Sequence, residues 1–330
     1  MYSAKEERYD HMVYVRSGSS GLKLPRISLG LWQNFGSVDS YENIRRMLLT
    51  AFDLGITYFD LANNYGPSRG SAEENLGRVL KQDLLAYRDE LILATKAGYD
   101  MWKGPYGNWG SRKYLIASLD QSLRRMGVDY VDIFYHHRPD PKTPMEETAQ
   151  ALSDMVRQGK ALYVGLSNYT TENAGRMMEL LKENGTPCIV NQNRYNLFER
   201  GLEDGFFELL ADKGSGCVIF SPLAQGMLTD KYLNGIPGGS RAARPGTTVQ
   251  ERYITEQKVH MAGKLNALAR ERGQTLAQMS LSWILTRKQV TSVLTGASRP
   301  EQITENVGIL GAPAFSEEEL AQIDRILAGE

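Results

Sequence analysis

Residues 91–136 decide the fold. They read LILATK at 91–96, RKYLIASLDQSLRRM at 112–126 and VDIFYH at 131–136. The first and third runs are short and largely apolar, as expected for strands that are covered on both faces. The middle run is longer and spaces its apolar residues as an amphipathic helix does. A strand, a helix and a second strand in this order predict two parallel strands joined by a helical crossover.

The same alternation extends along the chain on both sides of this unit. Expected strands cover residues 27–32, 57–61, 91–96, 131–136, 162–166, 188–192, 217–221 and 292–296. Expected helices cover residues 40–54, 71–80, 112–126, 145–158, 171–183, 204–212, 256–272 and 299–310. Eight strand–helix alternations imply parallel pairing, and this number closes a barrel, so the predicted fold is an α/β (β/α)8 TIM barrel.

An open, doubly wound sheet is the alternative architecture. That fold places a glycine-rich Gly-x-Gly-x-x-Gly turn after its first strand. Here the first strand runs into Trp32-Gln33-Asn34-Phe35-Gly36 instead. The sequence therefore favours the closed barrel.

Three segments fall outside the repeat. Residues 13–26 hold Ser-Gly-Ser-Ser-Gly at their middle and predict a β-hairpin before the barrel. Residues 223–255 form a long connection after the seventh strand, a length that usually has a function. Residues 316–327 predict an extra C-terminal helix, with Ser316 and Glu319 spaced as a capping box. Because no linker interrupts residues 1–330, we expect one domain.

Helix ends carry local signals as well. Ser71 opens a Ser-Ala-Glu-Glu pattern that predicts a second capping box. Glycines stand just past several predicted helix ends, where a left-handed residue is favoured: Gly55, Gly127, Gly159, Gly185, Gly214 and Gly273.

The composition excludes several classes of function. The 330 residues carry a formal net charge of −1 and show no basic cluster, which argues against nucleic-acid binding. No apolar run is long enough to span a bilayer, and the charged N-terminus lacks a signal core, so we expect a cytoplasmic protein. Two cysteines, Cys188 and Cys217, are too few for a disulfide scaffold or a zinc site and are expected as reduced core thiols.

Polar residues end the predicted strands, and the C-terminal strand ends are where barrels carry their chemistry. The second strand ends at Asp60, with Tyr65 shortly after it. The third ends at Lys96, and the fourth is followed by the adjacent pair His136 and His137. Later strands end at Ser167 and Asn168, at Gln192 and at Ser221.

Asp, Tyr, Lys and His together suit the reduction of a carbonyl group. Hydride addition builds negative charge on the oxygen, so a proton must be delivered there. The Tyr65 hydroxyl can donate it, but a free tyrosine has a pKa of about 10. A nearby ammonium group stabilises the phenolate, so we expect Lys96, held by Asp60, to lower the pKa of Tyr65. One of the two histidines would hydrogen-bond and polarise the substrate oxygen.

These motifs resemble the aldo-keto reductase superfamily. The quoted stretches are FDLANNYG at 59–66 with SAEENLG at 71–77, ATK at 94–96, and DIFYHHR at 132–138. The resemblance spans residues 27–306 and implies catalytic roles for Asp60, Tyr65, Lys96 and His137. Within the superfamily, KAGYDMW at 96–102 and GPYG at 104–107 are most similar to bacterial L-glyceraldehyde-3-phosphate reductases, and potassium-channel beta subunits come next.

The resemblance also implies a nicotinamide cofactor, NADPH/NADP+, extended across the barrel mouth. Ser167, Asn168 and Gln192 match the residues that hold the carboxamide. Phe220 matches the aromatic residue that stacks on the nicotinamide ring. Trp32 is expected near the ribose; the alternative is an ordinary aromatic residue at the rim.

Phosphate-binding residues follow the seventh and eighth strands, where barrels commonly hold phosphates. One loop resembles the loop that folds over the cofactor pyrophosphate in the superfamily. It comprises Ser221, Pro222, Leu223, Ala224, Gln225 and Gly226, then Lys231 and Arg241. At the start of the last barrel helix, where anions bind readily, the residues expected at the adenosine end are Gly296, Ser298, Arg299, Gln302, Glu305 and Asn306. Gly296 stands where many family members carry Lys.

The expected activity is NADPH-dependent reduction of a short aldehyde, such as L-glyceraldehyde 3-phosphate or methylglyoxal. Expected substrate contacts are Trp32, Tyr65, Trp102 and His137. The aromatic and basic residues of 99–114 either wall the substrate pocket or pack a surface loop. An NADPH-binding regulatory or redox-sensing subunit with slow turnover is the alternative function, and a metal-dependent hydrolase is a third. Assembly into a homo-oligomer stays open.

Overall fold

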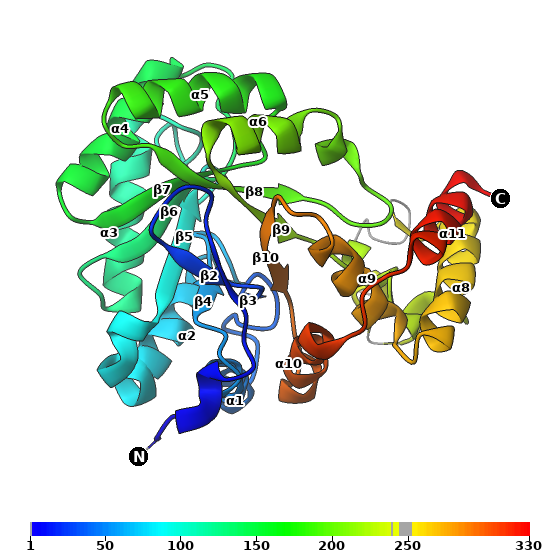
Figure 1. Cartoon of the computed structure of the whole chain (residues 1–330). Helices are drawn as coiled ribbons and strands as arrows, with labels where there is room; N and C mark the ends of the chain where they lie inside the picture. The colour runs from blue at the N-terminus through cyan, green and yellow to red at the C-terminus, as the bar shows by residue number, and fades with distance from the viewer. Residues whose placement is uncertain (1, 239, 244–252) are drawn as a thin grey trace.

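Eight parallel strands close into a barrel in this computed structural model, which describes residues 2–238, 240–243 and 253–330, without the side chain of Arg241. The order around the barrel is β10-β3-β4-β5-β6-β7-β8-β9. Figure 1 shows the strands at the centre and the helices around them. The barrel strands are β3 (Ile27–Gly30), β4 (Tyr58–Asp60), β5 (Ile92–Ala97), β6 (Val131–His136), β7 (Ala161–Ser167), β8 (Cys188–Arg194), β9 (Gly216–Phe220) and β10 (Val290–Thr295). The closed barrel confirms the predicted fold class and excludes the open sheet.

Helices follow the strands as the alternation predicted. They are α1 (Tyr41–Asp53), α2 (Ser71–Val79), α3 (Arg112–Met126), α4 (Met145–Arg157), α5 (Thr171–Glu183), α6 (Phe206–Lys213), α8 (Glu256–Glu271), α9 (Leu276–Leu285), α10 (Pro300–Val307) and α11 (Glu317–Ala328). Helix α11 is the predicted extra C-terminal helix, and it packs on α8 at the edge of the molecule (Figure 1). Its capping box between Ser316 and Glu319 is present.

Helix α9 was missed by the sequence analysis, which assigned the helix between the last two barrel strands to 256–272. Among the described residues of that connection the structure has two α-helices, α8 and α9, and α9 is the one that packs against β10. Helix α9 has no broad polar face, so its sequence shows no amphipathic pattern. Its buried residues include Leu276, Met279, Leu281, Trp283 and Ile284. The usable signal was the capping box that Thr275 forms with Gln278.

The capping box predicted at Ser71 is wrong. The N-cap of α2 is Gly70, in a left-handed conformation with φ 91°, and Ser71 is the first helical residue. The Ser71 hydroxyl instead donates to the carbonyl of Ser68 at 2.6 Å and accepts from the amide of Ser37 at 3.1 Å. It therefore joins two loops rather than capping the helix.

The predicted hairpin closes the N-terminal end of the barrel. Strands β1 (Tyr14–Arg16) and β2 (Lys23–Pro25) pair antiparallel. Leu24 is fully buried among side chains of the barrel interior, and Ser17 donates to the carbonyl of Ile189 near the start of β8 at 2.8 Å. With this end covered, the C-terminal strand ends form the open mouth.

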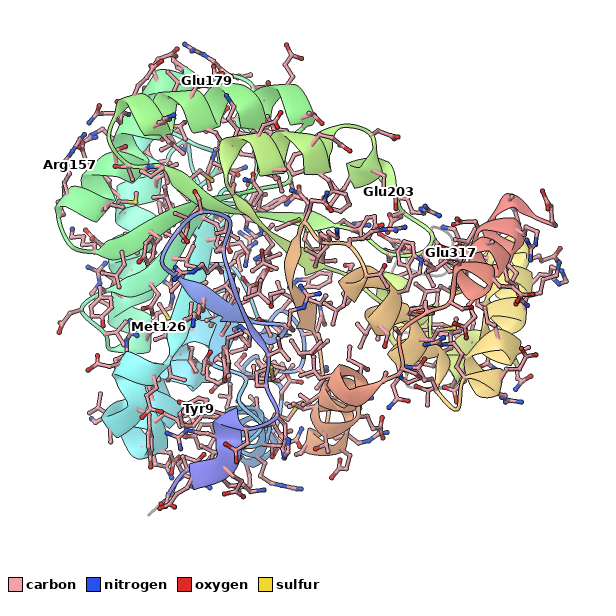
Figure 2. All side chains as sticks on the ribbon, viewed as in Figure 1. Tyr9, Met126, Arg157, Glu179, Glu203 and Glu317 are labelled. Carbon is pink, nitrogen blue, oxygen red and sulfur yellow. The ribbon has the colours of Figure 1, made fainter. Side chains whose placement is uncertain are left out.

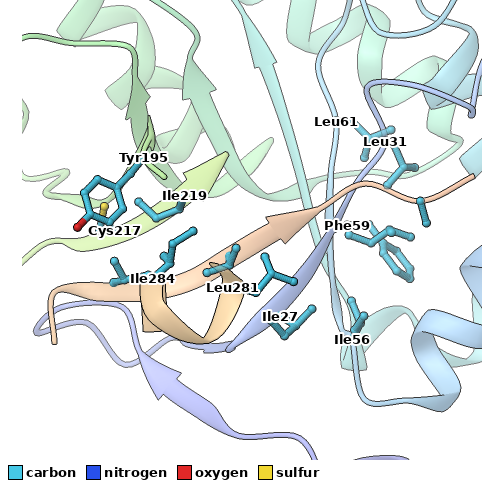
Figure 3. Close-up of a cluster of buried hydrophobic side chains, with 14 of the residues drawn as sticks. Ile27, Leu31, Ile56, Phe59, Leu61, Tyr195, Cys217, Ile219, Leu281 and Ile284 are labelled. Atoms are coloured by element: carbon cyan, nitrogen blue, oxygen red, sulfur yellow. The ribbon is translucent and has the colours of Figure 1, made fainter. Parts of the chain in front are cut away.

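Most of the apolar core lies between the barrel and its helices. Figure 3 shows part of it, where Ile27 and Ile219 lie near Leu281 and Ile284 of α9, and Phe59 lies near Ile56. Burial of such side chains is the main stabilising term of the fold. Both cysteines are buried and free, as predicted.

Charged side chains project from the outer surface of the helices, as Arg157, Glu179 and Glu317 do in Figure 2. None of the helices within 2–238, 240–243 and 253–330 combines the length and the apolar composition that crossing a bilayer requires.

Candidate active site

A buried ion pair forms the centre of the barrel mouth. Lys96 Nζ donates to Asp60 Oδ2 at 2.6 Å and to the carbonyl of Leu61 at 2.6 Å. Asp60 is the last residue of β4, and its partner in the parallel register is Ala94 on β5. Lys96 lies two residues beyond Ala94 on the same strand, so its side chain reaches Asp60. Burial lowers the pKa of Lys96, and the charge of Asp60 opposes that shift. A buried pair of this kind persists only when hydrogen bonds satisfy both groups.

The second oxygen of Asp60 is also satisfied. Gln192 Nε2 donates to Asp60 Oδ1 at 2.7 Å, and the Tyr58 hydroxyl donates to the same atom at 3.3 Å. The Tyr58 and Tyr135 hydroxyls share a hydrogen bond of 2.7 Å inside the barrel. Gly165 leaves room for this arrangement, because a Cβ there would lie 2.4 Å from the Tyr135 ring. Asp60 is therefore held on both oxygens before any ligand binds.

Tyr65 lies over this pair. Its ring centre is 5.1 Å from Lys96 Nζ, and its carbonyl accepts from the amides of Gly70 and Ala72 at 3.2 and 3.3 Å. Its hydroxyl makes no hydrogen bond within the described part of the chain. Burial raises the pKa of Tyr65 well above its usual value, and the charge of Asp60 adds to the rise.

This pKa direction differs from the sequence expectation that Lys96 lowers the pKa of Tyr65. The main reason is burial, which disfavours the phenolate, and the charge of Asp60 adds to it. Because Asp60 also pairs with Lys96 at 2.6 Å, the phenol does not face a lone cation. The phenol is thus fully protonated at neutral pH, which is the form that a proton donor needs.

His137, and not His136, faces Tyr65. The His137 ring lies edge-on, 6.0 Å from the Tyr65 ring and 4.6 Å from the Tyr99 ring, centre to centre. Burial lowers the pKa of His137 well below its usual value, and the charge of Lys96 lowers it further, so the ring is neutral. His136 ends β6 and turns the other way, with Nδ1 2.5 Å from the Tyr169 hydroxyl.

The next two residues expected to bind the cofactor join β7 to the same centre. Asn168 Nδ2 donates to the carbonyl of His137 at 2.9 Å and to Ser167 Oγ at 3.0 Å. Asn168 has a left-handed φ of 59°, which few residues other than glycine adopt. Ser167 is buried and Asn168 is exposed, so the amide stands at the mouth. Gln192 likewise uses its amide nitrogen within the protein, on Asp60.

Aromatic residues end two further strands. Phe220 closes β9, partly buried, with the Arg194 guanidinium carbon 5.6 Å from its ring centre. Trp32, after β3, keeps 48% of its surface exposed. Both lie where the sequence placed them, at the C-terminal strand ends.

The loop after β9 is strained. Ser221, Ala224 and Gln225 all have positive φ, at 53°, 45° and 60°. Asn196 Nδ2 donates to the carbonyl of Ser221 at 3.1 Å and helps to hold the loop. The buried Pro222 and the partly buried Leu223 and Gly226 complete it. Strain of this kind is typical of ligand-binding loops.

Two basic residues were expected to follow this loop. Lys231 is exposed, with Nζ 5.9 Å from the ring centre of Tyr232. The Arg241 side chain lies outside the described residues.

The start of α10, where the sequence predicted the adenosine contacts, is exposed. Ser298 and Arg299 are exposed, and a Cβ at Gly296 would meet no atom within 4 Å. Gln302 Oε1 accepts from the amide of Ser298 at 2.8 Å and from its hydroxyl at 3.2 Å, so Gln302 is engaged in holding the turn. Of the two residues expected at the adenine, Glu305 is exposed and Asn306 is buried. The structure thus brings Ser298 and Arg299 to the surface together.

Trp102 lies one layer behind the centre. Its ring centre is 5.2 Å from that of Tyr114, whose hydroxyl donates to the carbonyl of Tyr99 at 2.5 Å. Tyr99 is the residue of this segment that contacts His137. Arg112 pairs with Asp154 at 2.5 Å on the helical layer, away from the mouth. Of the residues in 99–114, Tyr99 therefore lies against the reacting centre, and the aromatic and basic residues around it mostly pack a surface loop.

The sequence model of the Aldo/keto reductase family matches residues 26–328. The chain belongs to this family. L-glyceraldehyde 3-phosphate reductases of Escherichia coli K12 and of Escherichia coli O157:H7 are each 57% identical over 332 residues, covering 99% of this chain and 96% of theirs. A protein of Oryza sativa subsp. japonica described as a probable voltage-gated potassium channel subunit beta is 34% identical over 323 residues, covering 96% of this chain and 97% of its own. This aldo/keto reductase is accordingly an oxidoreductase.

Sequence reasoning about this aldo/keto reductase missed Glu73. The side chain is fully buried, accepting from Thr95 Oγ1 at 2.5 Å and from Arg125 Nε at 2.7 Å. Thr95 precedes Lys96, so Glu73 ties α2, which holds the Tyr65 carbonyl, to the strand of Lys96. The signal was helical spacing, since Glu73 shares a face with the buried Leu76 and Leu80.

A metal-dependent hydrolase was the third function considered from the sequence. Within the described residues, no group of three His, Cys, Asp or Glu side chains is placed to hold a metal ion.

Proposed function

We propose that this enzyme uses NADPH to reduce a short aldehyde to an alcohol, with Tyr65 as the proton donor. The observation that carries the proposal is the neutral His137 and the protonated Tyr65 standing together over the Lys96–Asp60 pair. A carbonyl oxygen between the phenol and the imidazole would meet two neutral donors. Such donors stabilise the charge that develops on oxygen during reduction.

Each residue of the centre has its own part. Tyr65 passes its hydroxyl proton to the substrate oxygen, and Lys96 stabilises the phenolate left behind. Asp60 keeps Lys96 ionised and aimed, through the 2.6 Å contact. His137 Nδ1 is buried, so we assign Nε2 as the ring nitrogen that donates to the substrate oxygen.

The residues at the mouth suit a dinucleotide with phosphates. The exposed Ser298 and Arg299 supply a hydroxyl and a cation at the start of α10. The exposed amide of Asn168 and the ring of Phe220 suit a carboxamide and a flat ring. Bound there, NADPH supplies the hydride that the side chains of the protein cannot. The cationic and hydroxyl groups at the adenosine end favour NADPH over NADH, because only NADPH carries a 2′-phosphate.

The identity of 57% to L-glyceraldehyde 3-phosphate reductases supports L-glyceraldehyde 3-phosphate as the substrate, with methylglyoxal as a second short aldehyde. The relatives described as potassium channel beta subunits keep a regulatory subunit as the second candidate. The neutral His137 beside Tyr65 supports a catalytically active enzyme over a regulatory subunit.

NADPH oxidation followed at 340 nm with each aldehyde separates the two functions. We expect saturable turnover with L-glyceraldehyde 3-phosphate, on the order of 1–10³ per second for an ordinary enzyme. NADPH binding by fluorescence quenching, with no turnover on either aldehyde, would support the regulatory subunit. Tighter binding of NADH than of NADPH would contradict the cofactor assignment.

A further inference from the structure

Arg138 directly follows His137 and carries a positive charge that is paired with neutral groups alone in the described part of the chain. Its Nε donates to the carbonyl of Gly98 at 2.8 Å, and its Nη2 donates to Asn108 Oδ1 at 3.0 Å. Nη1 makes no hydrogen bond to a described residue. Both protons of Nη1, and the second proton of Nη2, are therefore left for a ligand.

Two aromatic rings hold the plane of this guanidinium group. Its central carbon lies 4.2 Å from the ring centre of Tyr99 and 3.6 Å from that of Trp109. Trp109 has a φ of 73°, an unfavourable left-handed value for a bulky residue. Asn108 Oδ1, which accepts from Arg138, also accepts from the amide of Trp109 at 2.7 Å. We call Tyr99, Arg138 and Trp109 the Arg138 sandwich.

The Arg138 sandwich borders the reacting centre. Tyr99 belongs to both, because its ring lies 4.6 Å from that of His137. The charge of Arg138 is near enough to lower the pKa of His137. Strand β6 is separated from β9 and β10 by intervening strands on both sides of the barrel, so Arg138 lies away from the loops proposed for the dinucleotide phosphates.

The cations of the 99–114 segment, part of which packs on Arg138, do not have this placement. Arg112 is neutralised by Asp154. Lys113 lies 5.2 Å from the ring centre of the exposed Tyr106, and Lys103 is exposed on the surface. A ligand anion at the mouth would therefore find its fixed cation at Arg138.

We propose that Arg138 is the subsite for the phosphate group of a short phosphorylated aldehyde, whose carbonyl meanwhile lies at Tyr65 and His137. This inference rests on the proposed function. A guanidinium group held flat offers two parallel N–H donors, which match a phosphate monoester better than a flexible ammonium does. The strained Trp109 is explained as well, since it keeps that donor pair in position.

The test is the change in substrate preference of Arg138→Met. L-glyceraldehyde 3-phosphate and L-glyceraldehyde share the reacting carbonyl and differ in the phosphate. We expect KM for the phosphorylated aldehyde to rise about 10- to 100-fold, the loss of one charge-assisted contact. The value of kcat/KM for L-glyceraldehyde should stay within about threefold. Arg138→Lys should fall between, because it keeps the charge and loses the fork.

Arg112→Met is the matched control, a nearby arginine that is already paired with Asp154, and should leave the preference unchanged. Inorganic phosphate should compete with L-glyceraldehyde in the parent and not in Arg138→Met. Calorimetry with glycerol 3-phosphate and with glycerol gives a readout free of turnover, and the parent should bind the phosphate ester alone.

An equal loss on both aldehydes would overturn the subsite and leave Arg138 as a support of the 99–110 loop. Unchanged binding of glycerol 3-phosphate by Arg138→Met would overturn it too. If the parent oxidises NADPH with neither aldehyde, the proposed function fails, while calorimetry still decides for or against the subsite.

Discussion

The two sides of the barrel mouth differ in how far their side chains are satisfied within the protein. On the side of β4, β5 and β6, Asp60 and Lys96 are buried and fully bonded to each other and to Gln192, Tyr58 and a carbonyl. On the side of β9 and β10, the loop after β9 is strained and the start of α10 exposes Ser298 and Arg299. The reacting centre is therefore preorganised within the protein, whereas the side proposed for the cofactor is exposed, with Ser298 bonded to Gln302 and Arg299 paired with Glu301 at 3.8 Å.

The largest combined effect on activity and stability is expected from removing the cation on the preorganised side. Lys96→Met should lower kcat on the order of 10²–10³-fold, because the phenolate loses its charge partner. It should also destabilise the protein by about 3–5 kcal/mol, since Asp60 is left buried and unpaired. Steady-state kinetics and urea unfolding measure the two effects.

The double variant Asp60→Asn/Lys96→Met separates them. It should recover most of the unfolding free energy while staying inactive. A Lys96→Met protein with parental stability would show that the pair is not buried as described.

Glu73 tests whether preorganisation extends behind the site. Glu73→Ala removes the buried partner of Arg125 and the acceptor of Thr95, and should cost about 3 kcal/mol in urea unfolding. Since α2 holds the Tyr65 carbonyl, kcat should fall while the Kd for NADPH stays unchanged. Glu179→Ala, at a half-exposed surface pair with Lys213, should leave the unfolding midpoint in place. A loss of NADPH affinity equal to the loss of kcat would contradict the separation of the two sides.

The buried histidines predict the direction of the pH dependence. Burial lowers the pKa of His136 to about 4 and that of His137 further below its usual value, so the unfolded chain binds more protons below pH 6.5. The contribution of these two histidines to the free energy of unfolding is therefore fully present above that pH, and it is lost as the pH is lowered. From pH 7 to pH 5 we expect a loss of about 2 kcal/mol from His136 alone.

Urea midpoints at the two pH values measure this loss. His260→Asn, which changes an exposed histidine, should keep the slope. A midpoint that rises toward pH 5 would refute neutral, buried rings at residues 136 and 137.

The smallest effect is expected on the cofactor side. Arg299→Met should weaken NADPH binding about 3- to 10-fold and leave NADH binding unchanged, because an exposed charge is well screened. Arg325→Met, an exposed arginine on α11, is the control. Equal weakening of both cofactors would remove Arg299 from the 2′-phosphate.

Much of this arrangement could be predicted from the sequence because it depends on local patterns. Apolar runs and spaced helices gave the barrel, and motifs at strand ends gave Asp60, Tyr65, Lys96 and His137. What could not be predicted depends on contacts between distant residues. The Gln192 amide turns to Asp60, and Glu73 meets Thr95 and Arg125. Helical spacing indicates that Glu73 is buried, but it does not identify the distant residues that these side chains contact. Helix α9 escaped because its burial removes the polar face on which periodicity depends.

The proposed reduction depends on the phenol of Tyr65, and the direct test is single-turnover reduction of L-glyceraldehyde 3-phosphate by Tyr65→Phe already loaded with NADPH. We predict a rate lowered on the order of 10²–10⁴-fold, with the Kd for NADPH unchanged, since only the hydroxyl proton is lost. A rate within a few fold of the parent would contradict Tyr65 as the proton donor and with it the proposed chemistry of the site.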